Sequence, residues 1–380
     1  MLLEKRHQEF REKIRAYALE KIAPSAAELD EKQEFMGRHL KSLAEMGLMG
    51  MVVPEEYGGK PVDTICYSIA VEELSRVCGS TGITIAAHNS LGLFPIYKFG
   101  TEEQRKKYLP RATGGELIAF GLTEPEAGSD AGATKTKAEL KGDHWVMNGT
   151  KCFITSASHA FASIATARTS DEPGVKAISS FILEKGWPGY DIGKKENKMG
   201  LRGSDTAFLH FTDLIIPKEN QLGKLGEGFK QFMITLDGGR ISIAAMALGL
   251  AQGAFDCALK YATERVQFGK PIAEYQAIQW QLADMATEIQ AARYLVYGAA
   301  AKKDAGMIFS QDSAMAKLYA GEVGTRTAAK AIQILGGVGC FTGKYPAERI
   351  WRDVKLCEIG EGTSEIQRLV IARELIKAVS

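Results

Sequence analysis

One glutamate near the end of the chain lies in a segment that could bring a carboxylate close to a ligand. Glu361 lies between Gly360 and Gly362, directly before an apolar helical pattern that Thr363 or Ser364 could cap. Glycines let a backbone approach a ligand closely, and burial beside apolar groups raises the pKa of a carboxylate and makes it a stronger base. Taken alone, a glutamate in such a segment is more often a solvated loop charge.

Three other segments carry residues that suit a large polar cofactor. Residues 121–133, GLTEPEAGSDAGA, are dense in hydroxyl, acidic and glycine residues whose amides and hydroxyls could line such a ligand. Residues 331–339 end a helical pattern at paired glycines, which permit close backbone approach. Arg265 suits a phosphate and Phe268 suits stacking. Alternatives for the first two are a surface turn and a helix C-cap, and the third segment says little alone.

The sequence lacks the motifs of several other kinds of site. The chain has no GxGxxG, P-loop or GxSxG motif, its six histidines show no HxxxH spacing and its six cysteines no CxxC pair, so no metal site is expected. The scattered cysteines suit a reducing cytoplasmic compartment. A net charge of +1 provides no field for nucleic acid or an anionic membrane. No apolar run approaches the roughly 18 to 20 residues of a membrane span, and no targeting segment is expected.

The elements that must position these residues fall into three parts. Residues 1–118 read as helices, residues 119–225 as short strands, and residues 226–380 as long helices. The long helices are predicted at about 229–264, 275–303, 312–335 and 363–378. Asn148-Gly149 lies between two strand-like runs, which predicts a hairpin turn.

In this order and with these separations, the segments resemble the acyl-CoA dehydrogenase family along essentially the whole chain. LTEPEAGSD and EGTSEIQRLVIA are similar to the two ends of that family's active site, and RGSDTAFLHF and LDGGR also match. Bacterial short-chain, butyryl-CoA and short branched-chain members are closest. The resemblance implies an α+β fold with an N-terminal helical domain, a middle β-barrel-like domain and a C-terminal four-helix bundle, with FAD in the cleft between them.

The resemblance also implies a set of ligand contacts. Contacts to the flavin ring come from Leu122, Thr123, Ser129, Phe153, Ile154 and Thr155. The rest of the same FAD is held by Thr363, Ser364 and Glu365. The adenosine diphosphate half is held across a dimer interface by Arg265, Phe268, Gln276, Gln333, Gly336 and Gly337. Substrate contacts come from Ser129, Asp237, Gly238, Gly239, Arg240, Gly360 and Gly362. FAD is then shared between subunits of a homotetramer, a dimer of dimers.

For the reaction, the resemblance implies that Glu361 removes the proton α to the thioester while the flavin accepts hydride from the β carbon. The thioester oxygen meets a flavin ribityl hydroxyl and the amide of Glu361. The product is a 2-enoyl-CoA, and the electrons pass to an electron-transferring flavoprotein, as in fatty-acid β-oxidation. Some members carry the base at the position of Gly239, which has no side chain to serve as one. Alternatives are an acyl-CoA oxidase that uses oxygen and a non-catalytic relative on the same scaffold.

The chain departs from the family pattern at three places. Phe153 replaces a common Trp, Gly360 replaces a common Tyr, and Cys340 replaces an aromatic residue in a loop with one extra residue. Volume freed at Gly360 predicts a short branched or alicyclic acyl-CoA as substrate, with a short straight chain second. The alternative is that Gly360 only supplies a positive φ, with the segment around Cys340 and Phe341 filling the volume.

Overall fold

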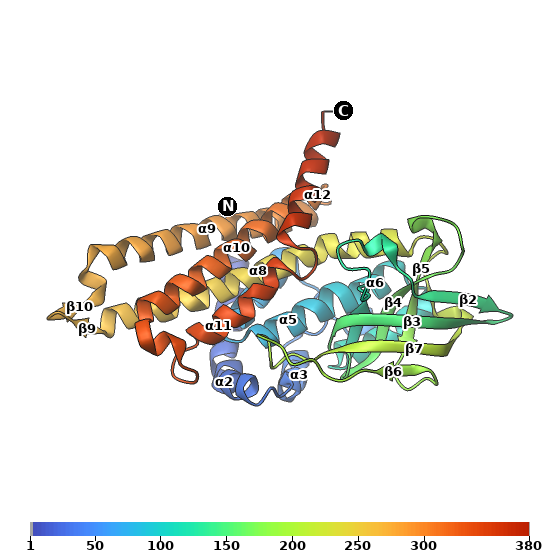
Figure 1. Cartoon of the computed structure of the whole chain (residues 1–380), viewed down its shortest axis with the longest axis horizontal. Coiled ribbons are helices and arrows are strands. Elements are labelled where there is room, and N and C mark those ends of the chain that lie inside the picture. Colours follow the sequence, from blue (N-terminus) through green and yellow to red (C-terminus); the bar gives the residue numbers. More distant parts are fainter. Residues whose placement is uncertain (1–2, 380) are drawn as a thin grey trace.

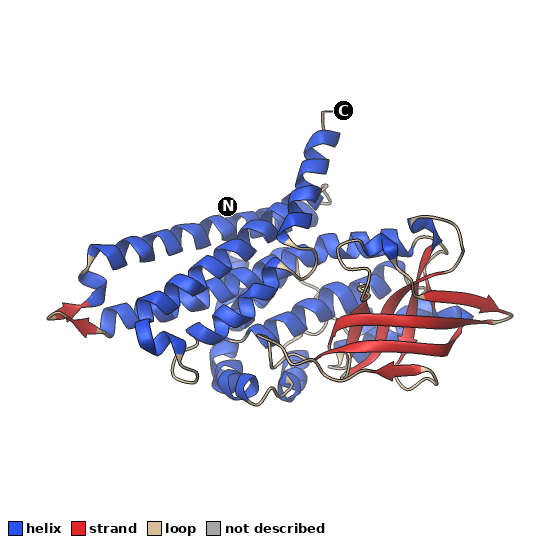
Figure 2. Ribbon diagram, viewed as in Figure 1, coloured by secondary structure: helices blue, strands red, loops and turns tan. Residues whose placement is uncertain are grey.

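The computed structural model describes residues 3–379, with helices at both ends of the chain and strands in the middle (Figures 1 and 2). This arrangement confirms the predicted α+β fold class. The N-terminal helices are α1 (Lys5–Tyr17), α2 (Ala23–Glu31), α3 (Leu40–Glu45), α4 (Thr64–Val77), α5 (Gly79–Ala87), α6 (Phe94–Phe99) and α7 (Glu102–Thr113).

The middle part is one mixed sheet of eight strands. Its order is β6-β7-β3-β2-β4-β5-β8, and β1 pairs in parallel with β4. Alternate side chains along β3 and β7, such as Trp145, Met147, Leu209 and Phe211, are buried, which is the period-two pattern of a half-buried sheet. The strands are β1 (Leu117–Gly121), β2 (Lys137–Lys141), β3 (His144–Thr155), β4 (Ala160–Arg168), β5 (Ile178–Glu184), β6 (Tyr190–Ile192), β7 (Thr206–Pro217) and β8 (Gln221–Leu222).

The hairpin turn predicted at Asn148-Gly149 is wrong. Both residues lie inside the continuous strand β3, and the chain turns instead between β2 and β3 at Gly142, which has φ 66°. The pairing of β3 with β7 shifts register between Met147 and Gly149, and the Asn148 side chain bonds with Asp213 across the two strands. The Asn-Gly pair therefore forms a bulge, because cross-strand bonds compete with the local turn preference.

The C-terminal part is built on α8 (Gly228–Glu264), a helix of 37 residues that runs along the molecule (Figure 1). Helix α10 packs against α8, α9 and α12, and α11 packs against α8 and α10. The four long helices predicted from the sequence are confirmed, within a few residues at each end. The elements after α8 are β9 (Val266–Gln267), β10 (Lys270–Pro271), α9 (Gln276–Asp304), α10 (Ser310–Leu335), α11 (Ala347–Val354) and α12 (Ser364–Lys377).

Helix α8 is the one helix in residues 3–379 that is long and apolar enough to cross a membrane by length and composition alone. This window differs from the expectation that no apolar run approaches the length of a membrane span. Because 78% of the window is buried inside the protein, its apolar character matches that of a core helix.

The predicted domain limits fall close to changes of secondary structure. Residue 118 lies in β1, shortly after α7 ends, and residue 225 lies between β8 and α8. We propose that the first limit lies just before β1, because β1 joins the sheet through β4.

Candidate functional site

Glu361 lies in a strained turn between the 3-10 helix η10 (Lys355–Glu358) and α12. Two successive residues have left-handed backbone angles, Glu361 with φ 55° and Gly362 with φ 96°. A non-glycine residue in this region costs free energy and is found most often at functional sites. The Thr363 hydroxyl accepts a hydrogen bond from the Ile366 amide at 3.3 Å, which confirms the predicted cap of α12. The helix start therefore fixes where the turn ends.

The Glu361 carboxylate lies directly over Gly239 of α8. A Cβ atom placed on Gly239 would come within 2.1 Å of Glu361 Oε2 and 3.3 Å of Leu91 Cδ2. Glu361 Oε2 is buried and has no hydrogen-bond partner among the described residues. The carboxylate thus fills the space that any side chain at position 239 would need, and one of its oxygens is free to accept a proton.

Burial raises the pKa of Glu361 to about 7, although the cations of Lys317 and Arg240 oppose this rise. The Arg240 guanidinium is itself paired with Asp237 at 2.5 Å, and Asp237 accepts a second bond from the Ser310 hydroxyl at 2.7 Å. A carboxyl group with this pKa exchanges a proton readily near neutral pH, as a general base requires.

A π-helical segment, η4 (His88–Leu93), links this carboxylate to the sheet. Leu91 of η4 lies beside Gly239, and a Cβ on Gly92 would be 2.7 Å from the carbonyl oxygen of Ile118 in β1. At the end of β1, Phe120 stacks on Phe232 of α8 with ring centroids 4.1 Å apart. These contacts place the start of the 121–133 segment against α8. The π-helical turn η4 was not predicted from the sequence, although such segments recur at functional sites.

A buried ion pair holds the 121–133 segment on the sheet. Lys151 of β3 donates to the Glu124 carboxylate at 2.6 Å and to the Leu122 carbonyl at 3.1 Å, and both charged side chains are almost fully buried. The Cys152 amide donates to the Thr123 carbonyl at 2.9 Å. Leu122 and Thr123 are therefore anchored beside β3, as the predicted flavin contacts require, while this ion pair was missed from the sequence.

Phe153 presents an exposed aromatic ring on the same strand. Its φ is 60°, its side chain is 66% exposed, and the β3–β7 register shifts between Lys151 and Ile154. The bulge turns this ring outward, where it suits stacking on a planar ligand. Ile154 is buried, so only its backbone is placed to meet a ligand, whereas Thr155 is partly exposed and Ser129 exposed.

A second group of predicted residues gathers at the far end of α8. The cavity there, about 510 Å³, is lined by Tyr261, Arg265, Gln267, Ile272, Ile334, Leu335, Gly336, Gly337, Val338 and Phe341. Arg265 has no ion-pair partner among residues 3–379, and a Cβ on Gly336 or Gly337 would meet nothing within 4 Å. Phe268, 96% exposed with φ 52°, lies in the β9–β10 turn, and Gln276 and Gln333 are exposed. An unpaired cation, open glycines and an exposed ring fit a nucleotide diphosphate.

The two groups are not brought together within one chain. Arg240 lies near the start of α8 and Arg265 directly follows its end, so at 1.5 Å per residue about 38 Å separate them. Figure 1 shows the β9–β10 hairpin at one end of the molecule and the sheet at the other. The predicted contacts to the flavin ring and those to the adenosine diphosphate half therefore lie toward opposite ends of one chain.

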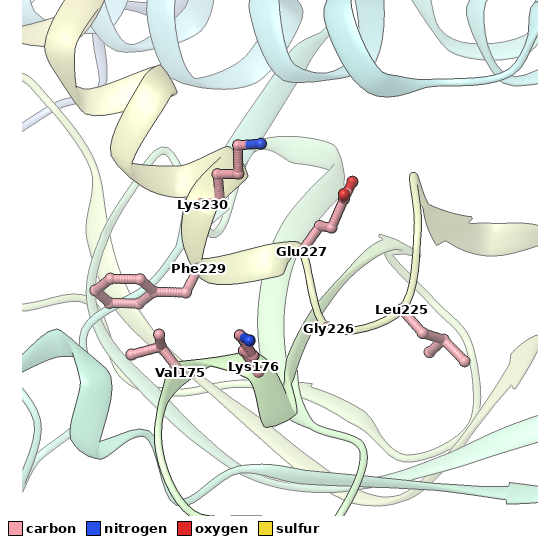
Figure 3. A pocket seen from close by; sticks show the side chains of 7 residues that line it. All are labelled: Val175, Lys176, Leu225, Gly226, Glu227, Phe229 and Lys230. Atoms are coloured by element: carbon pink, nitrogen blue, oxygen red, sulfur yellow. The ribbon is translucent and has the colours of Figure 1, made fainter.

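A further cavity, about 430 Å³, opens where α8 begins (Figure 3). It is lined by Val175, Lys176, Leu225, Gly226, Glu227, Phe229 and Lys230. A Cβ on Gly132 would lie 3.2 Å from Val175 Cγ1, so the end of the 121–133 segment borders this cavity. Its two lysines are the local cations that an anionic ligand needs in a protein of nearly neutral net charge.

Tertiary contacts also gather His7, Asp63 and Cys66, a group that sequence spacing did not reveal. His7 Nε2 lies 3.0 Å from Asp63 Oδ2, and Asp63 Oδ1 accepts from the Cys66 amide at 2.7 Å as the N-cap of α4. These bonds engage both Asp63 oxygens in joining α1 to α4, which gives the group a structural role.

Comparisons with known proteins find the same family along nearly the whole chain. Three family models match consecutive parts: Acyl-CoA dehydrogenase, N-terminal domain, over residues 4–116, the middle domain over 119–214 and the C-terminal domain over 226–376. A short-chain specific acyl-CoA dehydrogenase of Clostridium acetobutylicum is 49% identical over 97% of each chain. Butyryl-CoA dehydrogenase from Megasphaera elsdenii is 43% identical, with a TM-score of 0.96 over 99% of each chain. A chain solved in work on the electron transferring flavoprotein of Acidaminococcus fermentans is 48% identical, with the same TM-score and coverage.

Proposed function

Because the chain belongs to the acyl-CoA dehydrogenase family of FAD enzymes, we propose that it oxidises a short-chain acyl-CoA to the 2-enoyl-CoA and passes the electrons to an electron-transferring flavoprotein. The observation that carries the proposal is the buried, unpaired Glu361 carboxylate over Gly239. The similarity to a chain from work on an electron transferring flavoprotein supports the proposed acceptor.

In this proposal Glu361 removes the proton from the α carbon of the acyl group. Its carboxylate is desolvated and has a free oxygen, so proton transfer does not first require breaking a hydrogen bond within the protein. The amide of Glu361 belongs to the same strained turn and stabilises negative charge on the thioester oxygen. When bound, FAD supplies the acceptor for the hydride that leaves the β carbon.

The residues present fit FAD in two places. The flavin end fits Phe153 with Leu122, Thr123 and Thr155, and the adenosine diphosphate end fits Arg265, Phe268 and the glycines of the far cavity. Because the sheet and the β9–β10 hairpin lie at opposite ends of the molecule (Figure 1), we assign these two places to two different FAD molecules shared between subunits. A dimer is then the smallest complete unit, and a dimer of dimers satisfies the same geometry.

We place the nucleotide end of CoA in the cavity at the start of α8. Its phosphates are anionic, and Lys176 and Lys230 line that cavity (Figure 3). Residues 236–240 of α8 lie between it and Glu361, which leaves the pantetheine arm to run along Asp237 and Gly238 toward Gly239.

The contacts of Gly360 bear on the shape of the acyl group. Gly360 does not have a positive φ, so the alternative that it only supplies one is wrong. A Cβ there would contact Leu356 at 3.4 Å and no atom of Cys340 or Phe341 within its nearest contacts. Because Leu356 borders the freed volume, we propose a short straight acyl chain first. A short branched or alicyclic chain is the second candidate, favoured by the missing side chain.

Anaerobic titration of the purified protein with a panel of acyl-CoAs tests the proposed function. Butyryl-CoA is expected to bleach the flavin and to exceed propionyl-CoA in kcat/KM by about fourfold, the value of one buried methylene. Isobutyryl-, 2-methylbutyryl- and cyclohexanecarboxyl-CoA test the second candidate. Preference for a branched or cyclic chain would reverse the order of the two candidates, and absence of bleaching by every acyl-CoA would refute the dehydrogenase proposal.

The pH dependence of turnover reports the ionisation of Glu361. Since the base acts as the carboxylate and its pKa is about 7, kcat/KM is expected to fall about tenfold per pH unit below pH 7 and to level off above it. Stopped-flow reduction of the flavin between pH 5.5 and 9 measures this profile. A plateau extending down to pH 5.5 would show that the base is not raised in pKa by burial.

A further inference from the structure

A buried lysine lies next to the catalytic turn and was not among the residues predicted from the sequence. Lys317 of α10 is 1% exposed, and its Nζ donates a hydrogen bond to the carbonyl oxygen of Gly362 at 2.5 Å. No Asp or Glu of residues 3–379 lies within ion-pair distance of this ammonium. Burying an unpaired ammonium costs free energy, so its presence beside Glu361 calls for a role.

The helix positions next to Lys317 carry small side chains, which leave space for its long side chain. The helix positions three and four residues away are Ser313, Ala314, Ala320 and Gly321, all buried and small. Gly321 also permits close approach of η10, because a Cβ there would be 2.9 Å from the carbonyl oxygen of Cys357. Small side chains therefore flank Lys317 on α10, on the side of the helix from which it reaches Gly362.

A second buried donor holds the same turn from the opposite helix. Gln367 of α12 donates to the carbonyl oxygens of Glu361 at 3.3 Å and Gly362 at 2.9 Å. Side chains from α10 and α12 thus donate hydrogen bonds to the two consecutive carbonyls of this turn. Both residues of the turn, Glu361 and Gly362, have a positive φ. Such strained backbone persists only where surrounding contacts over-determine it.

We propose that Lys317 is a positioning residue of the active site, which fixes the catalytic turn through Gly362 and favours the ionised form of Glu361. The proposal rests on the proposed function of Glu361 as the base. It assigns Lys317 no contact with substrate.

Of the buried cations near Glu361, Lys317 is the one without an acidic partner among residues 3–379. Arg240 from α8 is paired with Asp237, and Glu358 from η10 is paired with Lys355 at 2.8 Å. Burial keeps the Cys357 thiol neutral, since it raises the pKa to about 12. Burial lowers the pKa of Lys317 to about 8, so the ammonium is mostly charged at pH 7. Removing it takes away a charge that favours the carboxylate, and the pKa of Glu361 then rises.

Lys317→Met, which keeps the length of the side chain but removes its charge and donor, tests the proposal. The acid limb of kcat/KM is expected to move upward by about one pH unit and kcat at pH 7 to fall about fivefold, because the ionised fraction of Glu361 drops from about one half to about one eleventh, with KM and FAD content little changed. Lys317→Arg, which keeps the charge, should restore the limb. Lys330→Met changes a partly exposed lysine of the same helix and should leave the profile unchanged.

A readout independent of turnover separates this proposal from the proposed function. Infrared difference titration of the holoenzyme follows the Glu361 carboxyl band, identified by its loss in Glu361→Gln, and the titration midpoint should rise in Lys317→Met. Lys317→Gln, which keeps an amide donor without the charge, replaces Lys317→Met if that variant does not fold. An unchanged midpoint in a folded neutral variant overturns the proposal, even where the protein has lost thermal stability.

Discussion

Glu361→Gln is expected to reduce the rate of flavin reduction by acyl-CoA by at least about 10²-fold, because a positioned general base contributes about 10² to 10⁴. The amide keeps the volume of the buried side chain but cannot accept the α proton. FAD content and acyl-CoA affinity should change little, since the hydrogen bonds from Gln367 and Lys317 to the turn involve backbone carbonyls.

Single-turnover reduction and equilibrium binding of acyl-CoA distinguish lost chemistry from lost binding in this variant. Glu56→Gln alters an exposed glutamate of the short 3-10 helix Glu55–Tyr57 and should leave both measurements unchanged. Near-normal reduction by the Glu361→Gln protein would mean that another residue is the base.

Gly239→Ala is expected to lower kcat by about 10²-fold, although it adds only one methyl group. That methyl would lie 2.1 Å from Glu361 Oε2, so the carboxylate must leave the position that it occupies over Gly239. A misplacement of about 1 Å at a reacting group can cost about 10²-fold in rate. The loss should therefore be in kcat, measured together with FAD content and unfolding temperature.

Gly298→Ala in α9 is the matched control, because a Cβ at that helical position would meet nothing within 4 Å. It should keep full activity and gain about 0.5–1 kcal/mol in the free energy of unfolding, the usual difference between Ala and Gly inside a helix. If Gly239→Ala were equally active, the carboxylate would not lie over Gly239 during turnover.

The local parts of the structure were predictable because their signals lie close together along the chain. The long apolar patterns of α8, α9, α10 and α12 were predicted within a few residues, and Thr363 caps α12 as expected. Such features depend on helical periodicity and on bonds within one turn. The Asn148-Gly149 hairpin failed because pairing of β3 with β7, more than 50 residues away in sequence, overrode the local preference.

The features of the candidate site also divide into those set by local sequence and those set by contacts between distant segments. The sequence by itself determined that Glu361 lies between two glycines before a helix and that position 239 has no side chain, and the family resemblance joined these two facts. Only the tertiary structure decided that the carboxylate fills the space over Gly239, that burial raises its pKa to about 7, and that Lys317 reaches Gly362. Those features depend on how α8, α10 and α12 pack, and a buried charge and a steric contact exist only when helices distant in sequence meet.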